Sequence, residues 1–129
     1  RMQALGLSPN SFGLHMITAA YSPEGAQWVD ELLVYLDGNR KIFDAGINAI
    51  PGLTSMPLEA TYLAWLDLGA YKIQDLQQAI LKEAKVAVVA GSDHGIDDDY
   101  PGFVRFNFAT SKPRITEAVR RIAELCEGH

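Results

Sequence analysis

The chain has 129 residues, of which 48% are hydrophobic and 21% charged, the balance of an ordinary globular domain. Its 16 acidic and 11 basic residues give a net charge of −5, which argues against nucleic acid or an anionic membrane as the partner. The longest apolar run is too short to cross a bilayer, the start lacks a long apolar leader, and a single cysteine fits a reducing cytoplasm.

The N-terminal third predicts two helices. Ser8 and Pro9 are suited to the cap and first position of one helix, and Ser22 and Pro23 repeat that pattern for a second helix that runs to about Asp44. Gly38 could break or kink this second helix, because glycine costs roughly 1 kcal/mol against alanine in a helix. Its expected buried stripe is Val29, Leu32, Leu33, Leu36 and Phe43.

The rest of the chain predicts three strands and two more helices. A loop or short strand with a Pro51-Gly52 turn is followed by a strand in the apolar segment 61–68, a helix over 73–85, a short strand at 86–91, an acidic loop, a strand at 102–110, and a helix from about Pro113 to Glu127. This order favours an α+β domain of two layers, with a short mixed sheet and helices packed on one face.

The strand "GFVRFNFAT" holds an unusual pair of polar residues. By the two-residue period, Val104, Phe106 and Phe108 face one side, while Arg105 and Asn107 face the other. The arginine must reach water, a carboxylate partner or a ligand, because an unpaired buried charge is very costly. Two interpretations stay open: a solvent-facing or ion-paired surface arginine, and a guanidinium that binds a carboxylate or phosphate, with Asn107 orienting it.

The other polar groups do not form a catalytic set. The loop with Asp93, His94 and the acids at 97–99 lacks the ligand spacing of calcium or zinc sites. Ser111 and Lys112 precede a proline in a connecting turn, and no glycine-rich phosphate loop is present. The remaining candidates each have an ordinary explanation: a helical His15, the last residue His129, and Cys126 on an apolar helix face.

Four stretches, taken in order, resemble a known family. They are "AAYSPEGAQWVDELLVYLDGN" (19–39), "PLEATYLAWLDL" (57–68), "VAVVAGSDHG" (86–95) and "GFVRFNFATSKPRITEAVRRI" (102–122). The set is similar to the C-terminal part of fold type I pyridoxal-phosphate enzymes, in the cystathionine β-lyase (C–S lyase) branch of the aminotransferase class I/II superfamily. The resemblance implies that residues 1–21 end a large domain and begin an interdomain helix, and that residues 22–129 form the small C-terminal domain.

The resemblance also implies roles for single residues. Arg105 matches the arginine that grips the substrate α-carboxylate, and His94 stands in a loop near the substrate, so His94 and Asn107 become candidate active-site residues. No lysine here matches the family's cofactor lysine, which would lie upstream of Arg1. We therefore expect pyridoxal phosphate in the full-length enzyme and none bound to this chain.

The expected partners are a missing N-terminal large domain, an amino-acid substrate, and a second copy in a full-length homodimer. The sequence does not choose between elimination of a thiol and transamination. Two alternatives stay open beside this hypothesis: a stand-alone α+β module that recognises a small carboxylate ligand, and an interaction domain without a ligand.

Overall fold

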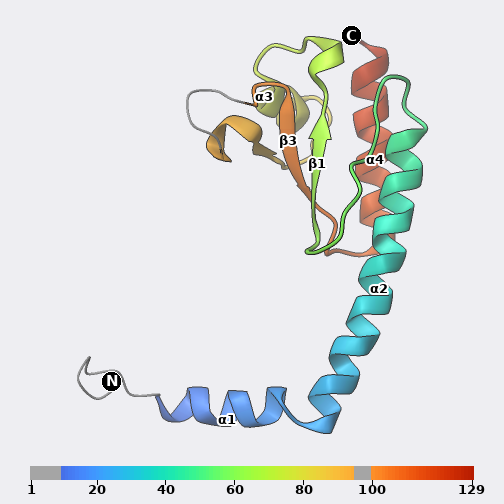
Figure 1. Cartoon of the computed structure of the whole chain (residues 1–129). Helices are drawn as coiled ribbons and strands as arrows, with labels where there is room; N and C mark the ends of the chain where they lie inside the picture. The colour runs from blue at the N-terminus through green and yellow to red at the C-terminus, as the bar shows by residue number, and fades with distance from the viewer. Residues whose placement is uncertain (1–9, 95–99) are drawn as a thin grey trace. The chain divides into compact units, whose positions relative to one another are not determined.

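The computed structural model describes residues 10–94 and 100–129. The element order over those residues confirms the predicted series of helices and strands (Figure 1). The elements are α1 (Ser11–Ala20), α2 (Pro23–Asn48), β1 (Leu63–Asp67), α3 (Leu76–Lys82), β2 (Val89–Ala90), β3 (Phe103–Asn107) and α4 (Lys112–Glu127), with single 3-10 turns at Gly69–Tyr71 (η2) and Gly91–His94 (η3).

The chain divides into two compact units, Arg1–Tyr35 and Leu36–His129. In the first unit, α1 is capped by Asn10, whose side-chain oxygen accepts from the Gly13 N–H at 2.6 Å; the expected cap, Ser8, lies outside the described residues. Ser22 does cap the next helix, because its hydroxyl accepts from the Gly25 N–H at 3.1 Å. The expected domain boundary at residue 22 stays a prediction.

Helix α2 is continuous and longer than expected. It passes through Gly38 without a break and ends at Asn48 rather than Asp44. The expected stripe is largely wrong, since Phe43 alone of its members is buried, while Val29 and Leu33 are exposed. The buried positions are instead Asn39, Phe43 and Ile47, spaced four residues apart on the part of the helix that meets the second unit's core.

The sheet has three strands in the order β1-β3-β2. Both pairs are antiparallel, so the expectation of a mixed sheet is wrong for the described strands. The physical reason is that β2 and β3 are consecutive strands and also neighbours in the sheet, an arrangement that favours antiparallel pairing because a parallel neighbour needs a long crossover. The α+β class itself is confirmed.

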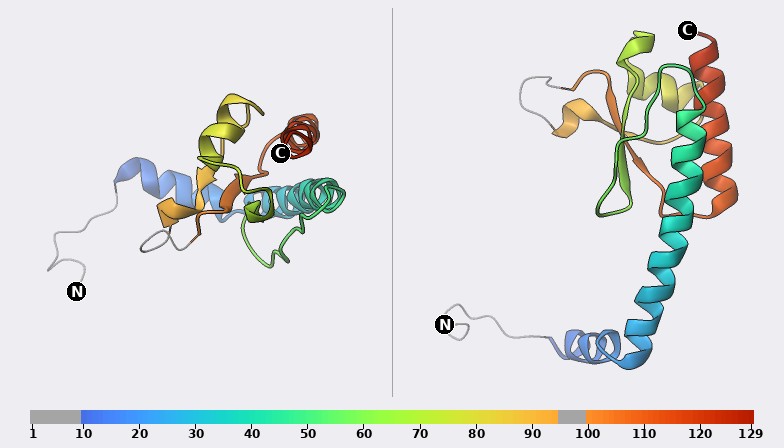
Figure 2. Two further views of the ribbon diagram at one scale, coloured as in Figure 1. Left: turned by 90° about the horizontal axis from the view of Figure 1, so that it is seen from above. Right: turned by 45° about the vertical axis from the view of Figure 1, so that its right-hand side comes forward.

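One apolar core lies between the sheet and the helices of the second unit. On the sheet side it takes every second residue of β3, and on the helix side it takes Phe43 of α2, Ile80 of α3 and Ile122 of α4. The Phe43 and Phe106 rings lie 4.7 Å apart between centroids, which joins α2 directly to β3. Figure 2 shows α4 beside the C-terminal part of α2 on one side of the sheet.

Among the helices of the described residues, none combines the length and the apolar character that crossing a lipid bilayer requires.

Candidate carboxylate-binding site

Arg105 lies at the middle of the central strand. In the antiparallel register it stands opposite Trp65 of β1 on one side and Val89 of β2 on the other. Its neighbours Val104 and Phe106 are buried against the helices, whereas Arg105 is half-buried on the opposite face. This alternation, predicted from the sequence, is confirmed, and it means that a stiff element positions the guanidinium.

The guanidinium of Arg105 has no protein partner within residues 10–94 and 100–129, where no carboxylate, hydroxyl or carbonyl hydrogen-bonds it. Other arginines of the chain are paired: Arg40 bridges Asp37 and Asp44 at 2.8 Å each, and Arg120 holds Glu117 at 2.7 Å. The acids at 97–99 lie outside the described residues. In the described part of the chain, the ion-pair interpretation of Arg105 therefore finds no support.

Asn107 shares the exposed side of the strand with Arg105. Its side-chain oxygen accepts from the Ala109 N–H at 2.8 Å, an Asx turn that ends the strand. This bond leaves the amide N–H₂ as the group that Asn107 could offer to a ligand. The role of Asn107 in binding stays a prediction.

His94 is brought to the same face by the turn η3. Its ring lies 5.6 Å from the Trp65 ring, nearly perpendicular to it, and Trp65 is the residue opposite Arg105. Gly91 allows this approach, because a Cβ there would lie 2.5 Å from the Tyr100 carbonyl oxygen and 2.8 Å from that of Phe103. The structure therefore places His94 beside Trp65 on the Arg105 face, and its part in substrate binding stays a prediction.

Asn39 is a site-supporting residue that the sequence reasoning missed. Its buried side-chain amide donates to the carbonyl oxygens of Phe108 at 3.0 Å and Thr110 at 2.8 Å, and so fixes the segment that leaves β3 after Arg105. The available signal was its spacing of four residues before Phe43 on the buried face of α2. An asparagine at an apolar position predicts a specific hydrogen-bond partner in the core.

The remaining candidates do not assemble a catalytic group. Ser111 is the N-cap position of α4 without a side-chain cap bond, and Lys112 is exposed in the first turn. Burial raises the pKa of the Cys126 thiol, which disfavours the thiolate form that reacts. His15 and His129 are exposed at opposite ends of the described chain. Within the described ranges, no three His, Cys, Asp or Glu side chains could hold a metal ion together.

The described residues also do not fit pyridoxal phosphate as a complete site. Lys41 pairs with Asp37 at 2.6 Å on the surface of α2, and the other described lysines are exposed on helices or turns. None lies on the Arg105 face within an enclosed cavity. Among the described residues, Arg105 is thus the candidate for a role in a pyridoxal-phosphate reaction, as a residue that binds the substrate and not the cofactor.

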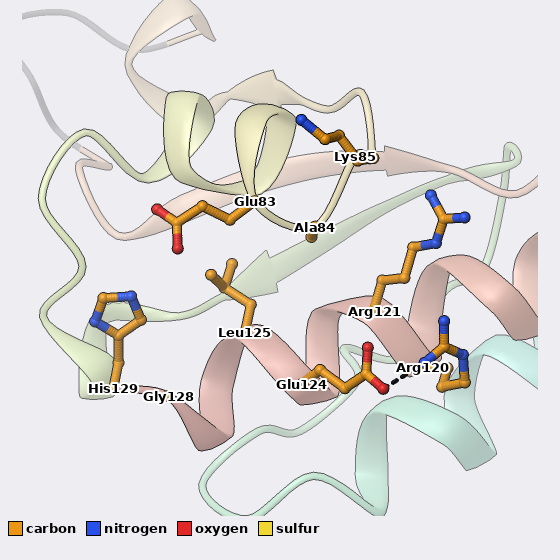
Figure 3. Close-up of a pocket in the computed structure, with 9 residues that line it drawn as sticks. All are labelled: Glu83, Ala84, Lys85, Arg120, Arg121, Glu124, Leu125, Gly128 and His129. Carbon is orange, nitrogen blue, oxygen red and sulfur yellow. Dashed lines mark hydrogen bonds and ion pairs between the residues drawn. The ribbon is translucent and has the colours of Figure 1, made fainter.

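A cavity of ≈ 430 Å³ lies elsewhere, between the end of α3 and the C-terminal part of α4 (Figure 3). Its charged lining is largely satisfied, since Arg120 pairs with Glu117 and Glu124 and Arg121 pairs with Glu117. Arg105 is not among its lining residues. The cavity therefore plays no part in the candidate site.

Comparison with known proteins is consistent with this geometry. The model of the family described as aminotransferase class I and II matches residues 1–122. The cystathionine β-lyase PatB of Bacillus subtilis is 37% identical over 116 residues, which cover 88% of this chain and 29% of PatB.

Two solved structures share the fold of the chain. A PLP-bound protein from Clostridium difficile 630, assigned as an aminotransferase, superposes with a TM-score of 0.84 at 29% identity, covering 97% of this chain and 33% of its own. A protein from Corynebacterium diphtheriae, assigned as a PLP-dependent β-cystathionase, gives a TM-score of 0.82 at 32% identity, covering 95% of this chain and 32% of its own.

The fold and the family match together define an aminotransferase-type protein. The chain belongs to the aminotransferase class I and II family, in the branch that contains the cystathionine β-lyases. It spans about a third of the length of the relatives that it matches.

Proposed function

We propose that this chain is the C-terminal small domain of a pyridoxal-phosphate-dependent C–S lyase or aminotransferase, and that Arg105 binds the α-carboxylate of its amino-acid substrate. The observation that carries this proposal is the half-buried guanidinium, held on the central strand and without a partner among the described residues. A planar fork of N–H donors matches a carboxylate in a bidentate arrangement.

The rest of the catalytic machinery belongs to a preceding large domain of the same polypeptide. Pyridoxal phosphate bound there would withdraw electrons from the substrate Cα, the step that elimination of a thiol and transamination share. Arg105 would bind and orient the substrate, and His94 and Asn107 would line the site beside it. We propose an active homodimer in the cytoplasm, as the family resemblance and the single cysteine suggest.

A stand-alone module that binds a small carboxylate would use Arg105 in the same way. The two hypotheses differ in what the chain is joined to. Coding sequence upstream of Arg1 that adds a large domain with a lysine-bearing loop favours the enzyme, whereas a start codon directly before Arg1 favours the module.

The functional test uses Arg105→Lys in the complete polypeptide. Lysine keeps the charge but not the fork, and loss of a hydrogen bond to a charged partner costs about 1.5–3 kcal/mol, or about 10- to 150-fold in kcat/KM. We expect that loss for amino acids, a much smaller loss for the matching amine that lacks the carboxylate, and unchanged cofactor absorbance. Unchanged kcat/KM for amino acids, or simple unfolding of the variant, would contradict the proposed role.

A further inference from the structure

The face of the sheet that carries Arg105 also carries an aromatic group formed by Trp65, His94, Tyr100 and Phe103. The Trp65 ring lies 5.6 Å from His94, 6.1 Å from Tyr100 and 6.3 Å from Phe103, measured between ring centroids. Tyr100 and Phe103 lie 5.7 Å apart and nearly perpendicular. Each of the four rings therefore has a ring contact, in the separation range where aromatic pairs attract one another.

This aromatic group does not belong to the core. The core side of the sheet is taken by Ala64, Leu66, Val104 and Phe106, whereas Trp65 and Phe103 alternate to the other face, where both remain partly exposed. Tyr100 is 46% exposed. Partly exposed rings gathered on the face of a sheet opposite its core are typical of a binding surface.

Two rings of this aromatic group, those of Trp65 and Phe103, lie close enough to Arg105 for one amino acid to contact all three residues. Trp65 is directly across the strand pair, where Cβ atoms are about 4.5–5.5 Å apart. Phe103 precedes Arg105 by two residues on the same face, which is about 6.8 Å along an antiparallel strand. An amino acid whose carboxylate binds Arg105 therefore spans the same few ångströms with its Cα, Cβ and side chain.

Asp67 places a negative charge beside Phe103 on the same face, and this charge disfavours acidic ligands. Asp67 stands opposite Phe103 in the register, and its carboxylate is held in place by the Gly69 N–H at 2.8 Å. A substrate whose side chain ends in a second carboxylate would bring like charges together there. An apolar side chain meets no such cost and gains contact with the rings.

We propose that Trp65 and Phe103 form the surface against which the side chain of the amino-acid substrate lies, so that the enzyme selects large apolar, preferably aromatic, substituents on Cβ. This specificity rests on the proposed carboxylate-binding role of Arg105. Trp65 and Phe103 are specificity-determining residues that touch the substrate beyond Cβ, and His94 and Tyr100 are positioning residues that hold the Trp65 ring.

The test compares S-benzylcysteine with S-methylcysteine in the complete polypeptide, by elimination or amino transfer. In Trp65→Ala we expect the ratio of kcat/KM for the benzyl to the methyl substrate to fall about 10-fold, and in Phe103→Ala several-fold, which is the range of one aromatic contact plus lost apolar contact. Trp65→Phe should restore most of the ratio. Tyr62→Ala is the matched control, because Tyr62 is 45% exposed and directly precedes β1, but makes no ring contact with the aromatic group among the described residues.

A binding measurement without turnover gives a second readout. By calorimetry, 3-phenylpropanoate should bind the wild-type protein more tightly than propanoate does, and Trp65→Ala should remove most of that difference. The proposal would be overturned if Trp65→Ala lowered kcat/KM equally for both substrates, or if the variant lost cofactor absorbance. Either result would show that the rings contact the rest of the protein and not the substrate. An unchanged substrate ratio in both alanine variants would also overturn the proposal.

The two proposals fail in different ways. If Arg105→Lys leaves amino-acid kcat/KM intact, the carboxylate-binding role fails whatever the Trp65 variants do. If Arg105→Lys weakens both cysteine derivatives alike while the Trp65 and Phe103 variants leave the ratio unchanged, the carboxylate role stands and only the aromatic specificity fails.

Discussion

Replacing Asn39 tests how the site's supporting segment is held. The Asn39 amide makes two hydrogen bonds across the core, to the carbonyls of Phe108 and Thr110, and its own Oδ1 is buried without a partner among the described residues. Two net hydrogen bonds are worth about 1–3 kcal/mol together, and truncation to alanine adds a cavity cost of about 1 kcal/mol. Removal of the unsatisfied oxygen returns about 1 kcal/mol. The expected loss in Asn39→Ala is thus about 2 kcal/mol.

Asn39→Asp separates hydrogen bonding from packing. Aspartate has nearly the same shape, but its carboxylate cannot donate and would face two carbonyl oxygens inside the core. A buried charge without a partner costs about 3–5 kcal/mol, so the aspartate variant should be less stable than the alanine variant. Its folded-state pKa should be raised, so that protonation recovers part of the loss as the pH falls toward 4.

The assay is urea unfolding of the 129-residue chain, followed by circular dichroism, with the slope m compared between variants. The control is Asn48→Ala, since the Asn48 side chain also hydrogen-bonds the backbone, here by accepting from the Ser55 N–H at 2.8 Å, but at an exposed position. We expect Asn48→Ala to lower the free energy of unfolding by less than about 1 kcal/mol. A loss below about 0.5 kcal/mol in Asn39→Ala, or an aspartate variant as stable as the alanine variant, would refute the assignment of Asn39 as the anchor of this segment.

Three further predictions concern the glycine that admits η3, an ion pair and the cofactor. Gly91→Ala should destabilise the chain by about 1–3 kcal/mol by the same urea assay, because its Cβ would overlap backbone oxygens, whereas Gly128→Ala, with no atom closer than 3.5 Å, should be nearly neutral. Hydrogen bonds from Arg120 and Arg121 lower the pKa of Glu117 from 4.5 to about 2. The stabilisation from this ionised carboxylate is therefore fully present above pH 4.5 and is lost as the pH falls to about 2. In Glu117→Gln, the free energy of unfolding should change less with pH over that range. The isolated chain mixed with pyridoxal phosphate should keep no stoichiometric visible absorbance after desalting. A retained band that is abolished by replacing one lysine would contradict the interpretation that this chain carries only part of the site.

The sequence predicted the Arg105 face well because its signal is local. A two-residue alternation needs only the strand itself, and Val104, Phe106 and Phe108 are large enough to decide which face is buried. The helix α4 was also close to its observed bounds, since its apolar stripe is complete within one element. Patterns of this kind can be interpreted without knowing which other elements pack against the strand or helix.

Other features depended on partners that a local pattern does not contain. The stripe assigned to α2 included Val29 and Leu33, which have the right spacing but are exposed in this chain. A helical period indicates an apolar face and not what covers it. The direction of the strands was missed for a related reason, because pairing is set by the connection and the register and not by composition. Trp65 alternates with the buried Ala64, which assigns it to the side of β1 opposite the core.

The packing of the second unit explains how the proposed site keeps its geometry without enclosing it. The helices cover one face of the sheet and hold β3 through Phe43 and Asn39, so the central strand is fixed from behind. Arg105 can then remain without a partner among the described residues, because the cost of its partial burial is limited by its exposure on the open face. A ligand carboxylate that arrives there breaks no ion pair among the described residues, and it meets a guanidinium carried by a strand that the core holds in place. Preorganisation of this kind lowers the entropy lost on binding, which supports the proposed role of Arg105 in recognising the substrate.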